Sequence, residues 1–285
     1  MAQSNEDPKS LVSTQWLFDH LEDPDLRILD ASWFLPNAGR DGAAEFVQSH
    51  IPNARFFDID KISDHRSELP HMAPPAEKFI SRVRALGVGD GHQVVVYDAL
   101  GIFSAPRVWW NFRLMGKENI AVLDGGLPKW RTEGRPLTAE PPLIRDRHIT
   151  VQRQAHLVKD VTQVANVAKL QSAQIIDARP ADRFHGFAPE PRPGLRSGHI
   201  PNSKNVPWNS VLETNGTMKS VKILKSVFED AGVDLKQPLI TSCGSGVSAA
   251  ILSLALYRMG HHDHALYDAS WAEWGMYADL SVTKG

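Results

Sequence analysis

The chain has 285 residues, of which 42% are hydrophobic and 22% charged, and its formal net charge is -2. This composition is typical of a globular protein, and the length allows two domains of ordinary size. The 31 basic and 33 acidic residues are interspersed, which argues against nucleic acid or a membrane surface as a partner. The sequence contains one cysteine, so we expect neither an internal disulfide nor a thiolate zinc site.

The first residues, MAQSNEDPKS, are polar and acidic. They lack the basic and apolar regions of a secretory signal and the arginines of a transit peptide. No apolar run reaches the length that spans a membrane, and a single cysteine fits a reducing compartment. These features predict a cytoplasmic protein.

Short apolar strands alternate with helical stretches along the first half of the chain. Strands are predicted at 28–30, 94–97 and 121–123. A proline-rich stretch with weak periodicity follows, with prolines at 136, 141 and 142, and is predicted to be a linker.

The second half repeats this pattern, with strands predicted around Ile175 and Leu239 and at 264–267. Strand, helix and strand at this spacing predict an α/β fold, in which each half forms a mainly parallel sheet with helices on both faces. We therefore expect one domain at 1–140 and a second at 159–285, joined by a linker at 141–158.

The two halves are copies of one another. RILDAS matches QIIDAR, SHIPNARFFDI matches GHIPNSKNVPW, and LDGGLPKW matches YDASWAEW. Equivalent residues lie at an almost constant spacing: Asp30 and Asp177, His50 and His199, Gly87 and Gly232, Asp98 and Cys243, Trp130 and Trp274. This regularity indicates two tandem domains of one fold.

The single cysteine lies where a strand passes through a glycine loop into a helix. QPLITSC is predicted to be a buried strand that ends at Cys243, and SAAILSLALYRMG a helix with Ser248 as N-cap and Gly260 just after its end. Backbone N–H groups of such a loop converge on one anion. We therefore expect Cys243 to ionise and act as a nucleophile. The alternative is a small core residue.

The first half provides a control, because Asp98 takes the place equivalent to Cys243. A carboxylate suits the same ring of N–H groups but is not a thiolate nucleophile. We therefore expect one active site per chain, in the second half.

These motifs resemble those of the tandem-domain rhodanese-like sulfurtransferases. The resemblance is carried by DARPADRFHG, GHIPNSKNVP, CGSGVSA and YDASWAEWG in the second half, and by SHIPNARFFDID, YDALGIFSAPRVWW and LDGGLPKW in the first. It covers nearly the whole chain. It implies two rhodanese-like domains and sulfur transfer through Cys243, without a cofactor or a metal.

The loop composition favours one sulfur donor. Relatives that prefer thiosulfate usually carry basic residues directly after the cysteine, whereas Gly244, Ser245 and Gly246 are neutral. This favours 3-mercaptopyruvate, whose carboxylate needs a planar donor such as arginine. The resemblance assigns the carboxylate and keto group to Arg183 and Arg192. The loop residues expected to contact the substrate are Gly244, Gly246, Val247 and Ser248.

The resemblance also implies a Ser/His/Asp set that handles protons. Ser245 supplies the hydroxyl, and DIDKISDHRSELPHM in the first half supplies Asp60 and His71. A histidine titrates near neutrality and a carboxylate fixes its tautomer. His65 is a rival for the histidine.

The implied mechanism is ping-pong. The Cys243 thiolate takes the sulfur of 3-mercaptopyruvate, pyruvate leaves as an enolate, and an external acceptor removes the sulfur from the Cys243 persulfide. Thioredoxin, another dithiol or cyanide would serve as acceptor. We expect a monomer.

Other functions remain possible. Thiosulfate could be the donor, or the chain could be a non-catalytic binding module, although such a module would not need to retain Cys243. A cysteine-dependent phosphatase needs a longer loop that closes on an arginine, but the sixth residue after Cys243 is Ala249. HHDH at 261–264 follows the predicted helix end, where histidines commonly cover backbone carbonyls, and we expect no metal there.

Overall fold

The computed structural model describes residues 7–285. Most of the polar start of the chain, which contributed to the expectation of a cytoplasmic protein, lies outside the described residues. Within residues 7–285, none of the helices is long and apolar enough to cross a membrane.

The described chain divides into two compact units. The first contains the chain up to Asp64, Pro74–Gln154 and Thr214–Met218, and the second contains His65–Ala73, Ala155–Glu213 and Lys219–Gly285. Each unit therefore includes a short segment from the other half of the sequence.

The first unit is built on a five-stranded sheet within the described residues, and every strand pairing in it is parallel. The strand order is β1-β5-β4-β2-β3. The strands are β1 (Leu11–Val12), β2 (Leu26–Asp30), β3 (Ala54–Phe56), β4 (Gln93–Tyr97) and β5 (Ile120–Leu123). Strand β4 is central and almost entirely buried, as expected for a parallel strand covered on both faces.

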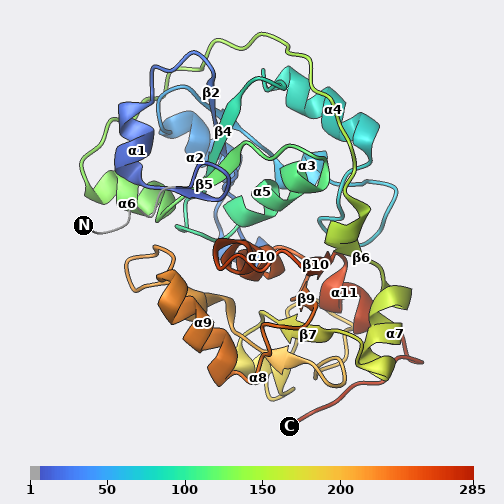
Figure 1. Ribbon diagram of the computed structural model, residues 1–285. Helices are drawn as coiled ribbons and strands as arrows, with labels where there is room; N and C mark the ends of the chain where they lie inside the picture. Colours follow the sequence, from blue (N-terminus) through green and yellow to red (C-terminus); the bar gives the residue numbers. More distant parts are fainter. Residues whose placement is uncertain (1–6) are drawn as a thin grey trace. The chain divides into compact units, whose positions relative to one another are not determined.

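Helices cover both faces of this sheet (Figure 1). They are α1 (Thr14–Asp19), α2 (Gly42–Gln48), α3 (Ile59–Ile62), α4 (Ala76–Ala85), α5 (Ala105–Leu114) and α6 (Gly126–Thr132), with a 3-10 turn at Pro36–Ala38. On one face, Leu17 of α1 and Trp130 of α6 belong to the same buried cluster as Val95 of β4. In the other layer, Phe112 of α5 contacts Phe79 of α4 edge to face, with ring centroids 5.0 Å apart. Both layers gain their stability mainly from buried apolar area.

The second unit repeats the plan, with the strand order β6-β10-β9-β7-β8 and only parallel pairings among its described strands. Its strands are β6 (Val158–Lys159), β7 (Gln174–Asp177), β8 (Lys204–Asn205), β9 (Leu239–Ser242) and β10 (His264–Tyr267). Its helices are α7 (Val161–Leu170), α8 (Ala181–Phe184), α9 (Val221–Asp230), α10 (Ala249–Arg258) and α11 (Ser270–Trp274), with 3-10 turns at Ala155–Leu157 and Trp208–Val211. Strand β9 is the middle strand of this sheet.

The α/β fold predicted from the sequence is confirmed. The strands predicted at 28–30, 94–97, 121–123 and 264–267 are β2, β4, β5 and β10, and those predicted around Ile175 and Leu239 are β7 and β9. The sequence analysis did not predict β1, β3, β6 and β8, which have two or three residues each.

The repeated HIP motif has a structural role in both units. The ring of His50 stacks on Phe46 with centroids 4.1 Å apart, and its Nδ1 donates to the Phe46 carbonyl at 2.7 Å. His199 repeats this arrangement with Phe184, at 3.9 Å and 2.9 Å. The two histidines thus tie a helix to the turn before the next strand, and their resemblance reflects the fold rather than the chemistry.

Candidate active site

Cys243 lies directly after β9, at the carboxyl end of the middle strand of its sheet. This is the edge at which open α/β sheets bind ligands. The predicted helix boundaries are confirmed: Ser248 is the N-cap residue of α10, although its side chain makes no capping hydrogen bond, and Gly260 follows the C-cap with a φ of 79°. Cys243 is 1% exposed. Burial alone would also fit a small core residue, so the surroundings of the thiol must decide its role.

Ser270 holds the backbone of Cys243. Its Oγ accepts a hydrogen bond from the Cys243 N–H at 3.0 Å and lies 4.0 Å from the Cys243 Sγ. The same hydroxyl donates to the Tyr267 carbonyl at 2.8 Å. The next N–H groups of α11, those of Trp271 and Ala272, donate to the carbonyls of residues 243 and 244. The start of α11 therefore fixes the start of the cysteine loop.

The sequence analysis did not identify Ser270, although the repeat contains a signal for it. Ser270 has a φ of 54°, a conformation that side-chain-bearing residues rarely adopt. Its equivalent in the first unit is Gly126, which has the same φ. A Cβ on Gly126 would lie 2.3 Å from the Gly101 carbonyl oxygen. Ser270 thus carries a side chain at a backbone position that favours glycine, and its hydroxyl holds the Cys243 N–H.

Both predicted substrate arginines lie beside the cysteine loop. A Cβ built on Gly244 would be 3.3 Å from the Arg183 Nη2 and 3.8 Å from the Arg192 Nη1. Arg183 is in α8, and its Nη2 also donates to the Glu190 Oε2 at 2.5 Å. The two guanidinium groups therefore meet at the residue that follows the thiol, and glycine at 244 leaves room for them.

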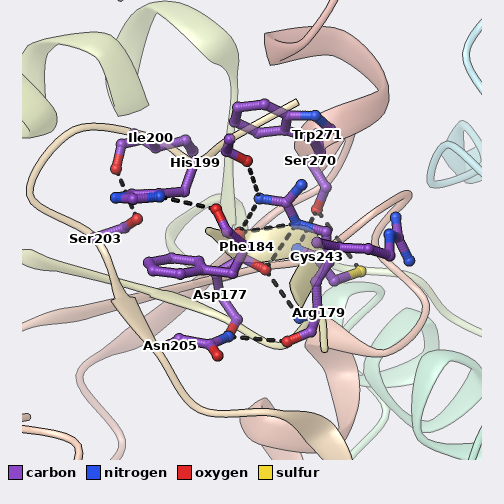
Figure 2. Close-up of polar contacts among 12 residues, drawn as sticks. Asp177, Arg179, Phe184, His199, Ile200, Ser203, Asn205, Cys243, Ser270 and Trp271 are labelled. Carbon is purple, nitrogen blue, oxygen red and sulfur yellow. Dashed lines mark hydrogen bonds and ion pairs between the residues drawn. The ribbon is translucent and has the colours of Figure 1, made fainter. Parts of the chain in front are cut away.

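A buried ion-pair network supports this arrangement and was not predicted from the sequence. Arg179 contacts both carboxylate oxygens of Asp177 at 2.6–3.1 Å, donates to Glu190 at 2.8 Å, and lies 4.2 Å from the centre of the Trp271 ring. Figure 2 shows Asp177 and Arg179 beside Cys243 and Ser270. Burial alone would lower the pKa of Arg179, but the carboxylates of Asp177 and Glu190 outweigh it and raise that pKa. The network links β7 to α11 and holds Glu190, the partner of Arg183.

Ser245 and both candidate histidines belong to the second unit. Ser245 is buried, and so is His71, which has a φ of 60°. Although His65 and His71 come from the first half of the sequence, the segment 65–73 belongs to the unit that contains Cys243. The Ala73 N–H donates to the Asp268 Oδ2 at 2.8 Å, which ties this segment to the turn between β10 and α11.

Asp60 belongs to the first unit, where its Oδ2 accepts a hydrogen bond from the Trp33 indole N–H at 3.0 Å. The pairing of Asp60 with His71 stays a prediction. Of the remaining loop residues, Gly246 has a φ of 79° and Val247 is buried. No group of three or more potential metal-binding side chains is found within residues 7–285.

The equivalent loop of the first unit holds an anion. The carboxylate of Asp98 is fully buried and accepts hydrogen bonds at 2.8–3.0 Å from four backbone N–H groups, those of Leu100, Phe103, Ser104 and Ala105. Burial raises the pKa of this carboxyl, and the four N–H donors oppose that rise. In the first unit, the strand-loop-helix backbone thus directs four donors at the first side chain of the loop, a position that Cys243 takes in the second unit.

The chain has extensive similarity to known proteins. A family model described as Rhodanese-like domain matches residues 13–133 and 160–277. Thiosulfate/3-mercaptopyruvate sulfurtransferase 1, mitochondrial, of Arabidopsis thaliana is 43% identical over an alignment of 293 positions, which covers 95% of this chain and 77% of that protein. The 3-mercaptopyruvate sulfurtransferase of Escherichia coli (strain K12) is 42% identical over 272 residues, covering 95% and 96%. The crystal structure of SseA from Escherichia coli, described as a 3-mercaptopyruvate sulfotransferase, matches with a TM-score of 0.84 and 40% identity, over 92% of this chain and 99% of that one.

Proposed function

The chain belongs to the rhodanese-like domain family, and we propose that it transfers the sulfur of 3-mercaptopyruvate, through a persulfide on Cys243, to a thiol acceptor. Two relatives whose names include 3-mercaptopyruvate sulfurtransferase are 42–43% identical to it over 95% of the chain. The observation that carries the proposal is the meeting of two guanidinium groups, those of Arg183 and Arg192, at Gly244, the residue that follows the nucleophile. This pair suits a substrate with a carboxylate and a neighbouring carbonyl.

The substrate sulfur is attacked by the Cys243 thiolate. The new bond joins the two sulfur atoms, the bond between sulfur and the C3 carbon breaks, and its electron pair passes into the pyruvate enolate. The enolate then takes the proton that the substrate thiol brought, leaving pyruvate and a Cys243 persulfide anion. Arg183 and Arg192 hold the carboxylate and stabilise the enolate oxygen, because charge develops there during the step.

The backbone N–H groups of the cysteine loop stabilise the negative charge on the thiolate and persulfide sulfur. The first unit supports this role, since four such groups surround the Asp98 carboxylate at the equivalent position. The neutral loop residues Gly244, Ser245, Gly246, Val247 and Ser248 line the substrate. The hydrogen bonds from such preorganised donors become stronger as negative charge develops on the sulfur, and the donors need not rearrange during the reaction.

Ser245, His71 and Asp60 form the proposed proton-handling set. The hydroxyl of Ser245 lies two residues from the thiol, and a histidine can return a proton near neutral pH. Asp60 would fix the tautomer of His71. His65 is the alternative histidine on the same segment.

The sulfur acceptor is an external thiol. Cys243 is the single cysteine of the sequence, so no second thiol of the chain can attack its persulfide. A thioredoxin-like dithiol would take the outer sulfur and release it as hydrogen sulfide on forming its own disulfide, and cyanide would take it as thiocyanate. We further propose a cytoplasmic monomer.

Thiosulfate is the alternative donor, because the name of the Arabidopsis relative includes it. The neutral residues after Cys243 favour the keto acid. Steady-state transfer to a dithiol, measured with each donor for the wild type and Cys243→Ser, separates the two. We expect 3-mercaptopyruvate to be the preferred donor and the intact mass of the wild type to show one added sulfur. Cys243→Ser should lose both the transfer activity and the added sulfur. If neither donor loads Cys243, only the assignment of the fold stands.

A further inference from the structure

A pocket of about 250 Å³ in the first unit is lined mainly by arginines. Its lining residues are Arg27, Arg55, Gly87, Leu143, Arg145 and Arg147. Arg27 is the second residue of β2 and Arg55 the second of β3, whereas Asp98 and its loop follow the carboxyl end of β4. The pocket is therefore at the opposite edge of the sheet from that loop.

The strand register places two of these arginines on one face. Leu29 pairs with Arg55 in parallel register, and Arg27 is two residues before Leu29 on the same strand. Side chains two residues apart on a strand share a face. Arg27 is fixed there by hydrogen bonds from its guanidinium to the carbonyls of Pro24, Leu26 and Gly87 at 2.7–2.9 Å.

The linker completes the pocket. Backbone atoms of Arg145 come within 3.1 Å of a Cβ built on Gly87, so this segment packs closely on the turn that follows α4. In Figure 1 it runs past α4 as the yellow-green trace. Arg145 and Arg147 alternate with Asp146 along it, and both are exposed. They add two exposed positive charges to those of Arg27 and Arg55, which lie on the sheet.

Arg55, which lines this pocket, has a buried donor without a partner in the described part of the chain. The residue is 7% exposed, and its Nε is buried without a hydrogen-bond partner within the described residues. Its other nitrogens donate to the Asn53 carbonyl at 2.6 Å and to the Leu143 carbonyl at 3.5 Å. Burial, with a smaller contribution from Arg27, lowers the pKa of Arg55 to about 10. A buried N–H of a charged group is costly to leave unpaired.

No carboxylate of the described residues forms a close ion pair with the four guanidinium groups, although Glu22 and Asp23 line a neighbouring hollow with Arg27 and Arg55. Within residues 7–285, none of them forms an ion pair shorter than 4.0 Å, although Asp25 acts on Arg27 at longer range. The field of the cluster extends to His92, whose pKa is lowered to about 4 by burial first and then by Arg27, Lys117 and Arg147.

The second unit shows that the fold does not require this charge. Gln174 takes the place of Arg27 and Lys204 that of Arg55, and the Lys204 Nζ donates to the Gln174 Oε1 at 2.8 Å. The residues that line the corresponding hollow include Asp234. In the second unit, the two equivalent side chains thus hydrogen-bond to each other, whereas in the first unit two arginines line an open pocket.

We propose that the arginine pocket binds a small phosphate-bearing anion. Guanidinium forks match the oxygens of a phosphoryl group in pairs, and a singly charged carboxylate would leave most of the positive charge uncompensated. The phosphoryl group would be held between Arg27 and Arg55, with the exposed Arg145 and Arg147 at the rim of the pocket. This site is separate from Cys243 and does not depend on the proposed sulfur transfer.

Calorimetric titration of the full chain with inorganic phosphate, pyrophosphate and adenosine 5′-monophosphate tests the site. We expect saturable binding of at least one, weakened about tenfold for each arginine removed. Arg145→Gln with Arg147→Gln is the first variant, because both side chains are exposed and the fold should survive. Arg27→Gln with Arg55→Lys is the second and installs the residues of the second unit. Arg131→Gln, exposed on α6, is the control.

The titrations distinguish between possible ligands and can refute the site. Equal affinity for phosphate and the nucleotide identifies free phosphate as the ligand, and tighter nucleotide binding identifies a phosphorylated metabolite. The site is refuted if none of the three anions binds saturably, or if Arg131→Gln weakens binding as much as the paired variants do. Sulfur transfer from 3-mercaptopyruvate should be unchanged in all variants, which separates this proposal from the proposed function.

Discussion

The two units use one backbone plan for different purposes, and three equivalent positions account for the difference. Asp98 fills the loop of the first unit with a carboxylate, where the second unit has Cys243. Ser32 follows Asp30 at the place where Arg179 follows Asp177. Gly126 stands where the second unit has Ser270. The strand-loop-helix backbone is thus common to both units, whereas the proposed nucleophile and the groups around it occur in only one.

The largest effect on sulfur transfer is expected when the loop of Cys243 is given the aspartate that the loop of the first unit has at the equivalent position. Cys243→Asp keeps an anion in the ring of N–H groups but removes the sulfur nucleophile, so sulfur transfer should fall by at least about ten-thousandfold. The melting temperature should change little, because the first unit tolerates the same residue. Transfer kinetics and thermal unfolding measure the two effects. A variant that still turns over would show that Cys243 is not the nucleophile.

The reciprocal change sharpens this result. Asp98→Cys introduces a thiol into the first loop, but Arg183 and Arg192, the proposed substrate arginines, both belong to the second unit. Intact mass after exposure to 3-mercaptopyruvate should therefore show one added sulfur rather than two.

A second prediction concerns the arginines beside Gly244. Lysine keeps the charge but loses the planar fork, so Arg183→Lys or Arg192→Lys should lower kcat/KM for 3-mercaptopyruvate about a hundredfold or more. Thiosulfate has no carboxylate, and its transfer should fall less. Arg131→Lys is the matched control. Equal losses with both donors would point to a general electrostatic role rather than to recognition of the keto acid.

The sequence predicted the fold because its main strands are continuous apolar runs, such as Val94 to Tyr97, that recur in the second half. Strands of two residues, such as β1 and β6, carry no periodicity, so only the structure revealed them. The assignment of segment 65–73 to the second unit was also not predicted, because the sequence of a loop does not indicate which unit it packs against.

The site was predicted in part for the same reason. Cys243 and the two arginines follow from motifs that are short and local. Ser270 and the ion pairs of Arg179 are contacts between residues distant in the sequence, such as β7 with the segment at Glu190. A close reading of the repeat could have found Ser270, since glycine at its equivalent position indicates an unusual backbone conformation.

A third prediction tests the unequal surroundings of Asp30 and Asp177. Burial raises the pKa of Asp30 to about 6, although hydrogen bonds from Ser32 and Tyr97 oppose the rise. The folded state therefore keeps a proton on Asp30 between about pH 4 and 6, where the unfolded chain has lost it. This contribution to stability is complete below pH 4 and is lost as the pH rises through 6, by about 3 kcal/mol.

Chemical denaturation at pH 5 and pH 7.5 measures this effect. Asp30→Asn removes the titration, so the stability of the wild type relative to this variant should decrease from pH 5 to pH 7.5. Asp177→Asn is the comparison, since it breaks a buried ion pair with Arg179 and should destabilise the chain at both pH values. An unchanged difference between the wild type and Asp30→Asn would mean that Asp30 titrates as an ordinary carboxyl.

The smallest effect is expected at Ser270. Ser270→Gly installs the residue found at the equivalent position of the first unit. It relieves the strain of the positive φ, which stabilises the fold, and removes the acceptor of the Cys243 N–H, which destabilises it. Each contribution is about 1 kcal/mol, so the two should nearly cancel. The turnover number should still fall about tenfold, because the cysteine backbone loses its anchor. Ser270→Ala loses the hydroxyl but keeps the strain, so it should match Ser270→Gly in rate and unfold at a lower temperature. If both variants keep the wild-type rate, the hydroxyl serves only the fold, and the difference between the two units reduces to the nucleophile and its arginines.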